Sequence, residues 1–202
     1  MKRIVLTGGG TAGHVTPNLA LIPHLAAAGW DIVYIGSVGG MERGLVEPTG
    51  VPFYEVATGK LRRYRDLKNL SDPFRVLKGT AQAAALMGKL RPNVVFSKGG
   101  FVSVPVVYGA ALHGVPVVLH ESDLTPGLAN KLCAPFAKAV CTTFPETAKA
   151  VRHGVYTGTP LRDELFAGQR KSGLAAFSLS GEKPVLMVTG GSSGAQAINA
   201  AV

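Results

Sequence analysis

Residues 6–22, LTGGGTAGHVTPNLALI, run from a short apolar segment into a glycine-rich loop and then into a helix-like segment. Gly8, Gly10 and Gly13 have the spacing G-x-G-x-x-G between a predicted strand and a predicted helix. Glycines in this position allow a tight turn and let backbone N–H groups approach a phosphate. The stretch therefore predicts the first strand-loop-helix unit of a phosphate-binding α/β domain.

Neither of the two common nucleotide-binding motifs is complete in this stretch. A dinucleotide site also needs an acidic residue at the end of the second strand, and that strand ends in YIGSVGG, residues 34–40. A P-loop needs Lys followed by Ser or Thr after the last glycine, and His14 and Val15 stand there instead. An oxidoreductase is therefore a disfavoured alternative.

His14 lies where the first helix should begin, and two interpretations are open. In one, the imidazole only packs or hydrogen-bonds locally. In the other, the helix N-terminus keeps the imidazole neutral, so that it can take a proton from a hydroxyl nucleophile. The chain has no DxD pair that could hold a metal with a sugar nucleotide, so we expect neither a metal nor a cofactor.

Strand-like and helix-like segments alternate through most of the chain. Such alternation predicts a doubly wound parallel α/β sheet of the Rossmann type. Predicted strands cover residues 4–7, 32–35, 52–56, 94–96, 117–119, 139–142 and 155–156, and the clearest predicted helices cover 17–28 and 74–90.

A change in composition after residue 160 predicts a domain boundary. Residues 1–160 form the first Rossmann-like domain, and the polar residues 161–183 form a linker. Residues 184–202, PVLMVTGGSSGAQAINAAV, repeat the strand-loop-helix pattern of the N-terminus. We therefore expect a second Rossmann-like domain of which only the first unit is present, and we expect the fragment alone to be inactive.

A further glycine pair, in SKGGFVS at residues 97–103, follows the predicted strand at 94–96. Loops at the carboxyl ends of parallel strands point toward a shared ligand crevice. The loop at Gly99 and Gly100 and the loop at Gly8–Gly10 are therefore predicted to share one site.

Composition restricts the class of protein. Hydrophobic residues make up 47% of the 202 residues, which is enough for a buried core, and the formal net charge of +9 favours an anionic partner. No apolar run approaches the roughly 18 residues needed to span a bilayer, and the N-terminus does not resemble a signal peptide. Cys133 and Cys141 have no CxxC spacing, so we expect reduced thiols and no zinc site.

Five motifs occur in an order that resembles the MurG family of peptidoglycan N-acetylglucosaminyltransferases. They are GGGTAGHVTPNLAL at 8–21, SKGGFVSVP at 97–105, VVLHESDLTPGLANK at 117–131, GTPLR at 158–162 and GGSSGAQAIN at 190–199. This resemblance implies a two-domain GT-B glycosyltransferase at the cytoplasmic face of the bacterial cell membrane, bound peripherally. It also implies metal-free, inverting transfer of GlcNAc from UDP-GlcNAc to lipid I, which gives lipid II.

The resemblance implies roles for individual residues, with His14 as the catalytic base. Donor contacts fall on Thr11, Ala12, Gly13, Asp123, Arg162 and Ser192, and acceptor or diphosphate contacts fall on Gly10, Gly99, Gly100, His120 and Glu121. Some family members have Asn where this chain has Asp123, and an Asp can accept but not donate a hydrogen bond. A non-catalytic nucleotide- or phospholipid-binding module is the alternative function.

The basic stretch at residues 60–78 acquires a role in this context, because apolar side chains interleave with its cations. Its predicted membrane-docking residues are Arg62, Arg63, Arg65, Lys68, Phe74, Arg75 and Lys78. Cations there would meet anionic headgroups while apolar side chains enter the interface. A solvated helix face is the alternative. An RNA-binding patch is disfavoured because no RNA-binding module accompanies it, so no nucleic-acid partner is expected.

Overall fold

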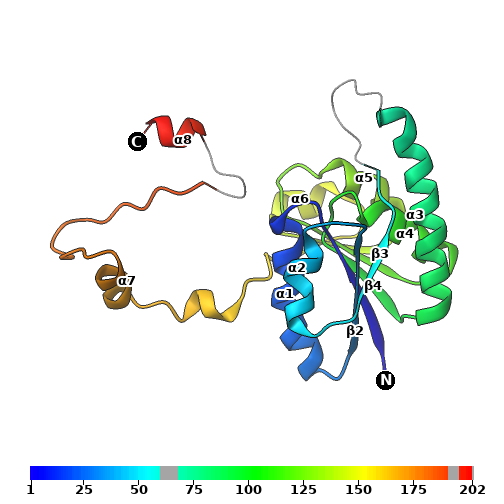
Figure 1. The fold of residues 1–202 in the computed structure, drawn as a ribbon, viewed down its shortest axis with the longest axis horizontal. Coiled ribbons are helices and arrows are strands. Elements are labelled where there is room, and N and C mark those ends of the chain that lie inside the picture. The colour runs from blue at the N-terminus through cyan, green and yellow to red at the C-terminus, as the bar shows by residue number, and fades with distance from the viewer. Residues whose placement is uncertain (60–67, 191–195, 202) are drawn as a thin grey trace. The chain divides into compact units, whose positions relative to one another are not determined.

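The computed structural model describes residues 1–59, 68–190 and 196–201. The chain forms two compact units, Met1–Pro160 and Leu161–Val202. The first unit holds the sheet, and Figure 1 shows its strands and helices.

The first unit is built on a seven-stranded sheet in the order β3-β2-β1-β4-β5-β6-β7. Every neighbouring pair is parallel, which confirms the predicted doubly wound α/β class. The strands are β1 Arg3–Thr7, β2 Asp31–Ser37, β3 Phe53–Val56, β4 Val94–Ser97, β5 Val117–Glu121, β6 Ala137–Thr142 and β7 Gly154–Tyr156.

Helices connect the strands, as a parallel sheet requires. They are α1 Ala12–Ala27, α2 Glu42–Val46, α3 Lys68–Leu90, α4 Ser103–Leu112, α5 Leu128–Cys133 and α6 Pro145–Ala150, with 3₁₀ turns η1 Glu47–Thr49 and η2 Ala134–Phe136. The helix expected at 17–28 begins five residues earlier than predicted. Thr11 is extended and ends the glycine loop, so α1 starts at Ala12 and Pro17 lies inside the helix, where it is buried.

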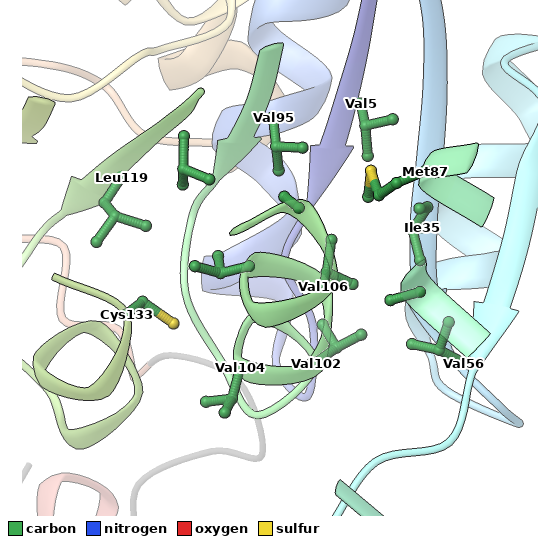
Figure 2. Packing of buried hydrophobic residues seen from close by; sticks show 14 of the residues in the cluster. Val5, Ile35, Val56, Met87, Val95, Val102, Val104, Val106, Leu119 and Cys133 are labelled. Carbon is green, nitrogen blue, oxygen red and sulfur yellow. The ribbon is translucent and has the colours of Figure 1, made fainter. Parts of the chain in front are cut away.

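Two apolar clusters cover the two faces of the sheet. On one face, α3 and α4 pack against Val5, Val95 and Leu119, and Figure 2 shows these strand residues with Met87 of α3 and Val106 of α4 in one cluster. On the other face, Val15 of α1 packs with other apolar residues of the sheet and helices; this cluster is Ile4, Leu6, Val15, Ile22, Ile32, Tyr34 and Val46. Each buried Val or Leu contributes about 1.5–3 kcal/mol, so burial on both faces holds the sheet between its helices.

The order of the strands places the site. The chain moves from β1 outward through β2 and β3 and then crosses back to β4 on the other side of β1. The loops after β1 and β4 therefore leave neighbouring strands at the same edge and turn to opposite sides. In doubly wound sheets a crevice opens at this point.

The second unit differs from the sequence prediction. It contains η3 Asp163–Phe166, α7 Arg170–Ala176 and α8 Gln196–Ala201, but no strand among its described residues. The strand predicted within residues 184–189 is wrong for this structure, and Leu186 and Met187 are 87% and 77% exposed. A single strand needs a neighbour for its backbone hydrogen bonds, and the described part of this unit offers none. The small-residue helix predicted after the glycine loop is present as α8.

Over the residues that the structure describes, no helix is both long enough and apolar enough to cross a bilayer.

Close packing of α3 and α4 generates a prediction about stability. A Cβ added at Gly109 of α4 would lie 2.7 Å from the Cβ of Ala83 in α3. We expect Gly109→Ala to lower the free energy of unfolding by about 1–3 kcal/mol, because the two helices would have to move apart. Chemical denaturation measures this change.

Gly88→Ala is the matched control. Gly88 is an exposed helical glycine of α3, and an added Cβ would meet only the His113 side chain, at 3.3 Å. Here we expect an increase of about 0.5–1 kcal/mol, because alanine restricts the unfolded chain more than glycine. Equal effects of the two substitutions would contradict the proposed tight contact.

Candidate functional site

A cleft of about 390 Å³ opens at the carboxyl ends of β1, β4 and β5. The loops that follow these three strands, with the start of α1 and of α5, form its walls. The lining residues are Thr11, Gly13, His14, Lys98, Gly99, Gly100, Phe101, Glu121, Ser122, Asp123, Gly127, Leu128, Ala129 and Asn130. Gly99 and Gly100 of the second glycine loop thus line the cleft together with Thr11 and Gly13, which follow the first glycine loop, Gly8–Gly10.

The two glycine loops approach each other too closely for side chains. The Gly9 N–H donates to the Gly99 carbonyl at 3.3 Å. Gly100 has a φ of +83°, and a Cβ added there would lie 2.1 Å from the Gly9 carbonyl oxygen. Glycine is required at position 100 by both its backbone conformation and its surroundings.

Buried polar groups hold the first glycine loop in place. The Tyr34 hydroxyl donates to the Gly8 carbonyl at 2.7 Å, and Asn18 Nδ2 donates to the Thr7 carbonyl at 3.1 Å. The Glu42 carboxylate is fully buried beside the loop, and its Oε1 accepts from the Ser37 backbone N–H at 2.6 Å. These contacts fix the loop before any ligand binds.

His14 lies in the first turn of α1 and lines the cleft. Its Nδ1 is 3.1 Å from the Thr11 hydroxyl, and its backbone N–H donates to the Thr11 carbonyl at 3.1 Å. Burial, followed by the nearby Lys98 cation, lowers the pKa of His14 below 6.5, while contacts to the Gly9 backbone, Glu121 and Asp123 act in the opposite direction. The imidazole is therefore held mainly neutral near neutral pH, as the second interpretation of His14 requires.

The N-terminus of α1 faces the same cleft. Thr11, its N-cap residue, makes no side-chain capping hydrogen bond, since its hydroxyl contacts His14 instead. The first N–H groups of a helix have no partner within the helix and carry a partial positive charge. They are suited to bind an anion in the cleft.

Glu121 shapes the loop after β5. Its Oε1 accepts from the Asp123 N–H, and its Oε2 accepts from the Gly127 N–H and from Asn130 Nδ2, all at 2.9 Å. The carboxylate is 5% exposed. Since both oxygens are already occupied, its geometry suits a residue that positions the 122–127 loop.

Asn130 and Lys98 line the cleft and were missed by the sequence analysis. Asn130 Oδ1 is buried without a partner among the described residues, and Lys98 is 2% exposed with Nζ donating to the Ser122 hydroxyl. The signal for Lys98 was its place beside the glycine pair in SKGGFVS. A lysine in such a loop is usually expected to be exposed to solvent, so its burial became evident only from the folded structure.

The remaining predicted site residues are placed as follows. Gly10 and Ala12 belong to the first loop and to the start of α1, but they do not line the described cleft. His120 is 1% exposed and also does not line it; its Nε2 contacts the Gly158 carbonyl at 2.8 Å. Burial lowers the pKa of His120. Arg162 is exposed in the second unit, and Ser192 lies outside the described residues.

The predicted membrane-docking stretch is only partly described. Arg62, Arg63 and Arg65 lie outside the described residues, and Lys68 begins α3. Further along α3, Phe74 and Leu77 are 73% and 66% exposed, and Arg75 and Lys78 are exposed beside them.

Both cysteines are free thiols, Cys133 being buried. Across residues 1–59, 68–190 and 196–201, no three His, Cys, Asp or Glu side chains gather as a metal site would require.

Residues 4–142 match the model of the glycosyltransferase family 28 N-terminal domain. The chain belongs to glycosyltransferase family 28. The match covers the sheet from β1 to β6 and all three loops of the cleft.

Curated relatives confirm the resemblance to the MurG family. A protein of Lachnospira eligens is 56% identical over 100% of this chain and 58% of its own length, and one of Oceanobacillus iheyensis is 59% identical over 98% and 56%. Both are named UDP-N-acetylglucosamine–N-acetylmuramyl-(pentapeptide) pyrophosphoryl-undecaprenol N-acetylglucosamine transferase. The chain thus spans little more than half the length of these relatives.

Solved structures agree on the fold. Acinetobacter baumannii MurG has a TM-score of 0.68 and 30% identity, over 81% of this chain and 47% of that protein. A Staphylococcus aureus MnaA–UDP structure has a TM-score of 0.56 at 15% identity, over 74% and 41%, and supports the fold alone.

The Glu121 network generates a prediction. We expect Glu121→Ala to lower the free energy of unfolding by about 3 kcal/mol, because three donors lose a charged acceptor. Asp123→Ala is the control, since Asp123 is exposed and should change stability by less than about 0.5 kcal/mol. Thermal and chemical denaturation compare the two variants. Similar stability of both would show that Glu121 does not hold the loop.

Proposed function

We propose that this chain provides the acceptor side of an inverting N-acetylglucosaminyltransferase. The enzyme would move GlcNAc from UDP-GlcNAc to the muramyl sugar of lipid I and so form lipid II. The observation that carries the proposal is His14, which is kept mainly neutral and placed between two glycine loops at one cleft. The names of the close relatives support the same reaction.

In the proposed reaction, His14 is the general base. The acceptor hydroxyl oxygen attacks the anomeric carbon of GlcNAc, and its proton passes to the imidazole. The bond from the anomeric carbon to the UDP oxygen breaks on the opposite face, so the configuration inverts and UDP leaves with the electron pair. A neutral imidazole can accept this proton, whereas a lysine ammonium in the same place could not.

The acceptor diphosphate would bind at the glycine loops. Gly99 and Gly100 line the cleft together with Thr11 and Gly13 at the start of α1, and Gly10 precedes Thr11 in the first loop. Backbone N–H groups of a glycine loop and of a helix N-terminus are suited to bind phosphate. Glu121 would hold the 122–127 loop against this ligand, and His120 would secure β5 through Gly158. These two residues therefore act through the shape of the site.

The donor contacts are proposed on motif position. Thr11, Gly13 and Asp123 line the cleft. Ala12 lies between Thr11 and Gly13 in the sequence. Arg162 and Ser192 are proposed as donor contacts in the same way. UDP-GlcNAc would reach the cleft next to His14.

We also propose that the start of α3 docks on the cytoplasmic face of the bacterial membrane, where the acceptor's lipid is anchored. Phe74 and Leu77 are exposed apolar side chains with Arg75 and Lys78 beside them. Such a surface can place apolar groups among headgroups while its cations meet anionic lipid.

Transfer assays test the reaction. The 202-residue chain would be assayed alone and joined to the part of the Lachnospira eligens relative that it does not match, with UDP-GlcNAc and a lipid I analogue. Formation of the disaccharide by the fusion supports the proposal, whereas transfer by the chain alone would contradict the expectation that it is inactive by itself. Absence of transfer from a correctly folded, UDP-GlcNAc-binding fusion would overturn it.

In the active form, we expect His14→Ala to lower kcat by roughly 10²–10⁴-fold, the usual cost of losing a general base. Binding of UDP-GlcNAc should change little. Since burial and the Lys98 cation lower the pKa of His14 from its ordinary value, protonation of the base should reduce the rate only at a lower pH than for an ordinary histidine. A plot of kcat against pH measures where the rate declines as the pH is lowered. A decline centred above pH 6.5 would contradict the lowered pKa of His14.

Vesicle co-sedimentation tests the docking surface. We expect replacement of Arg62, Arg63 and Arg65 with Ser to weaken binding to anionic vesicles by roughly a hundredfold, since each cation contributes about 1 kcal/mol. The effect should be larger at low salt. Unchanged binding would contradict the proposal.

Replacement of Phe74 and Leu77 with Ser should weaken binding at high salt as well. Leu112→Ser is the control, because Leu112 is 73% exposed at the end of α4. Leu112 is also distant from the proposed docking surface. Its neighbour in the chain, His113, lines a hollow with Met87 and Arg91 at the opposite end of α3 from Phe74.

A further inference from the structure

Lys98 connects all three loops of the cleft. It directly follows β4, and its backbone N–H donates to the Thr7 carbonyl at the end of β1 at 2.9 Å. A Cβ added at Gly8 would lie 3.1 Å from the Lys98 Cβ, so the side chain starts against the first glycine loop. Its Nζ reaches the Ser122 hydroxyl in the loop after β5. Although only 2% exposed, Lys98 lines the cleft.

The Lys98 charge has no counter-ion at bonding distance. Among the described residues, Nζ makes one hydrogen bond, to a neutral hydroxyl, and no ion pair. The nearby Glu121 carboxylate is already engaged by backbone N–H groups and by Asn130. A buried ammonium without a counter-ion is costly, and burial accordingly lowers the pKa of Lys98, opposed by Glu121 and Asp123. An anion entering the cleft would relieve this cost.

A second buried side chain of the cleft, Asn130, has one polar atom without a partner among the described residues. Asn130 is 7% exposed, and its Nδ2 donates to the His120 carbonyl at 3.1 Å and to Glu121 Oε2 at 2.9 Å. These two acceptors fix the orientation of the amide, so Oδ1 is the atom left unpaired. A Cβ added at Gly99 would lie 3.5 Å from this oxygen, which places it beside the second glycine loop. Asn130 Oδ1 requires an O–H or N–H donor.

We propose that Lys98 is a phosphate-binding residue of the cleft, and that it takes a diphosphate ester whose attached group donates a hydrogen bond to Asn130 Oδ1. The ammonium has two N–H donors left after the bond to Ser122, enough to contact one phosphate through two oxygens. Thr11 and Gly13 at the start of α1, with Gly99 and Gly100 after β4, line the same volume. The assignment of this ester to the acceptor rests on the proposed function. The phosphate site itself does not depend on that function.

Calorimetry on the 202-residue chain tests the site with inorganic pyrophosphate. We expect Lys98→Met to weaken binding by about tenfold or more, because a charge-assisted contact to phosphate is lost. Lys98→Arg should retain part of the affinity. Lys131→Met is the matched control: Lys131 follows Asn130 but is exposed and does not line the cleft, so its loss should change affinity by less than about twofold. Equal weakening by Lys98→Met and Lys131→Met would overturn the proposal.

NMR of the unsubstituted chain tests the same site without requiring that a substituted chain folds correctly. With ¹³C-labelled lysine, pyrophosphate should shift the Lys98 ε signal and raise the Lys98 pKa, because a bound anion favours the ammonium form. No change at this signal under conditions where pyrophosphate binds would overturn the proposal.

Two further ligands distinguish the sources of the diphosphate. A prenyl diphosphate and UDP are compared, and the acceptor assignment predicts that Lys98→Met weakens the prenyl ligand more. A larger loss for UDP would overturn that assignment. If pyrophosphate binding depends on Lys98 but the fusion transfers no GlcNAc, the phosphate site is supported and the proposed function is wrong. If the fusion transfers GlcNAc but pyrophosphate binding does not depend on Lys98, the proposed function is supported and the phosphate site is wrong.

Discussion

The approach of the loop after β1 to the loop after β4 is the constraint on which the site depends. Gly9 donates to Gly99 at 3.3 Å, and Gly100 packs so closely on Gly9 that any Cβ there would collide with the Gly9 carbonyl. The contact is possible because β1 and β4 are parallel neighbours that end together. If the loops were further apart, the N-terminus of α1 and Lys98 would no longer face one volume.

This contact has to be maintained by groups outside the cleft. Tyr34 holds the Gly8 carbonyl from β2, while Asn18 of α1 bonds both Thr7 and Tyr34. On the other wall, Glu121 closes the 122–127 loop with two backbone N–H groups and Asn130. These buried hydrogen bonds hold the loop backbones in place, while Asn18 Oδ1 and Asn130 Oδ1 have no partner among the described residues. The ligand therefore meets walls that are already in position.

The elements of the first unit could be predicted because their patterns are local. The strands at 4–7 and 94–96 and the glycine loops after them follow from short apolar runs and turn residues, and the crevice rule then joins Gly99 to His14. Other features depend on distant partners. The start of α1 at Ala12 follows from the extended Thr11, and the missing strand at 184–189 follows from the lack of a pairing edge. The occupied oxygens of Glu121 and the burial of Lys98 likewise required three-dimensional neighbours.

The charges of the cleft form one coupled set. Lys98 lowers the pKa of His14, and Glu121 and Asp123 raise it. The same two carboxylates raise the pKa of Lys98 against the effect of its burial. Lys98 and His14 are therefore suited to different roles in one small cleft. The ammonium is suited to hold a phosphate, and its field helps to leave the imidazole unprotonated. The proposed base can therefore follow a glycine loop, because Lys98, at the end of the neighbouring strand β4, would supply the cation that phosphate loops usually carry.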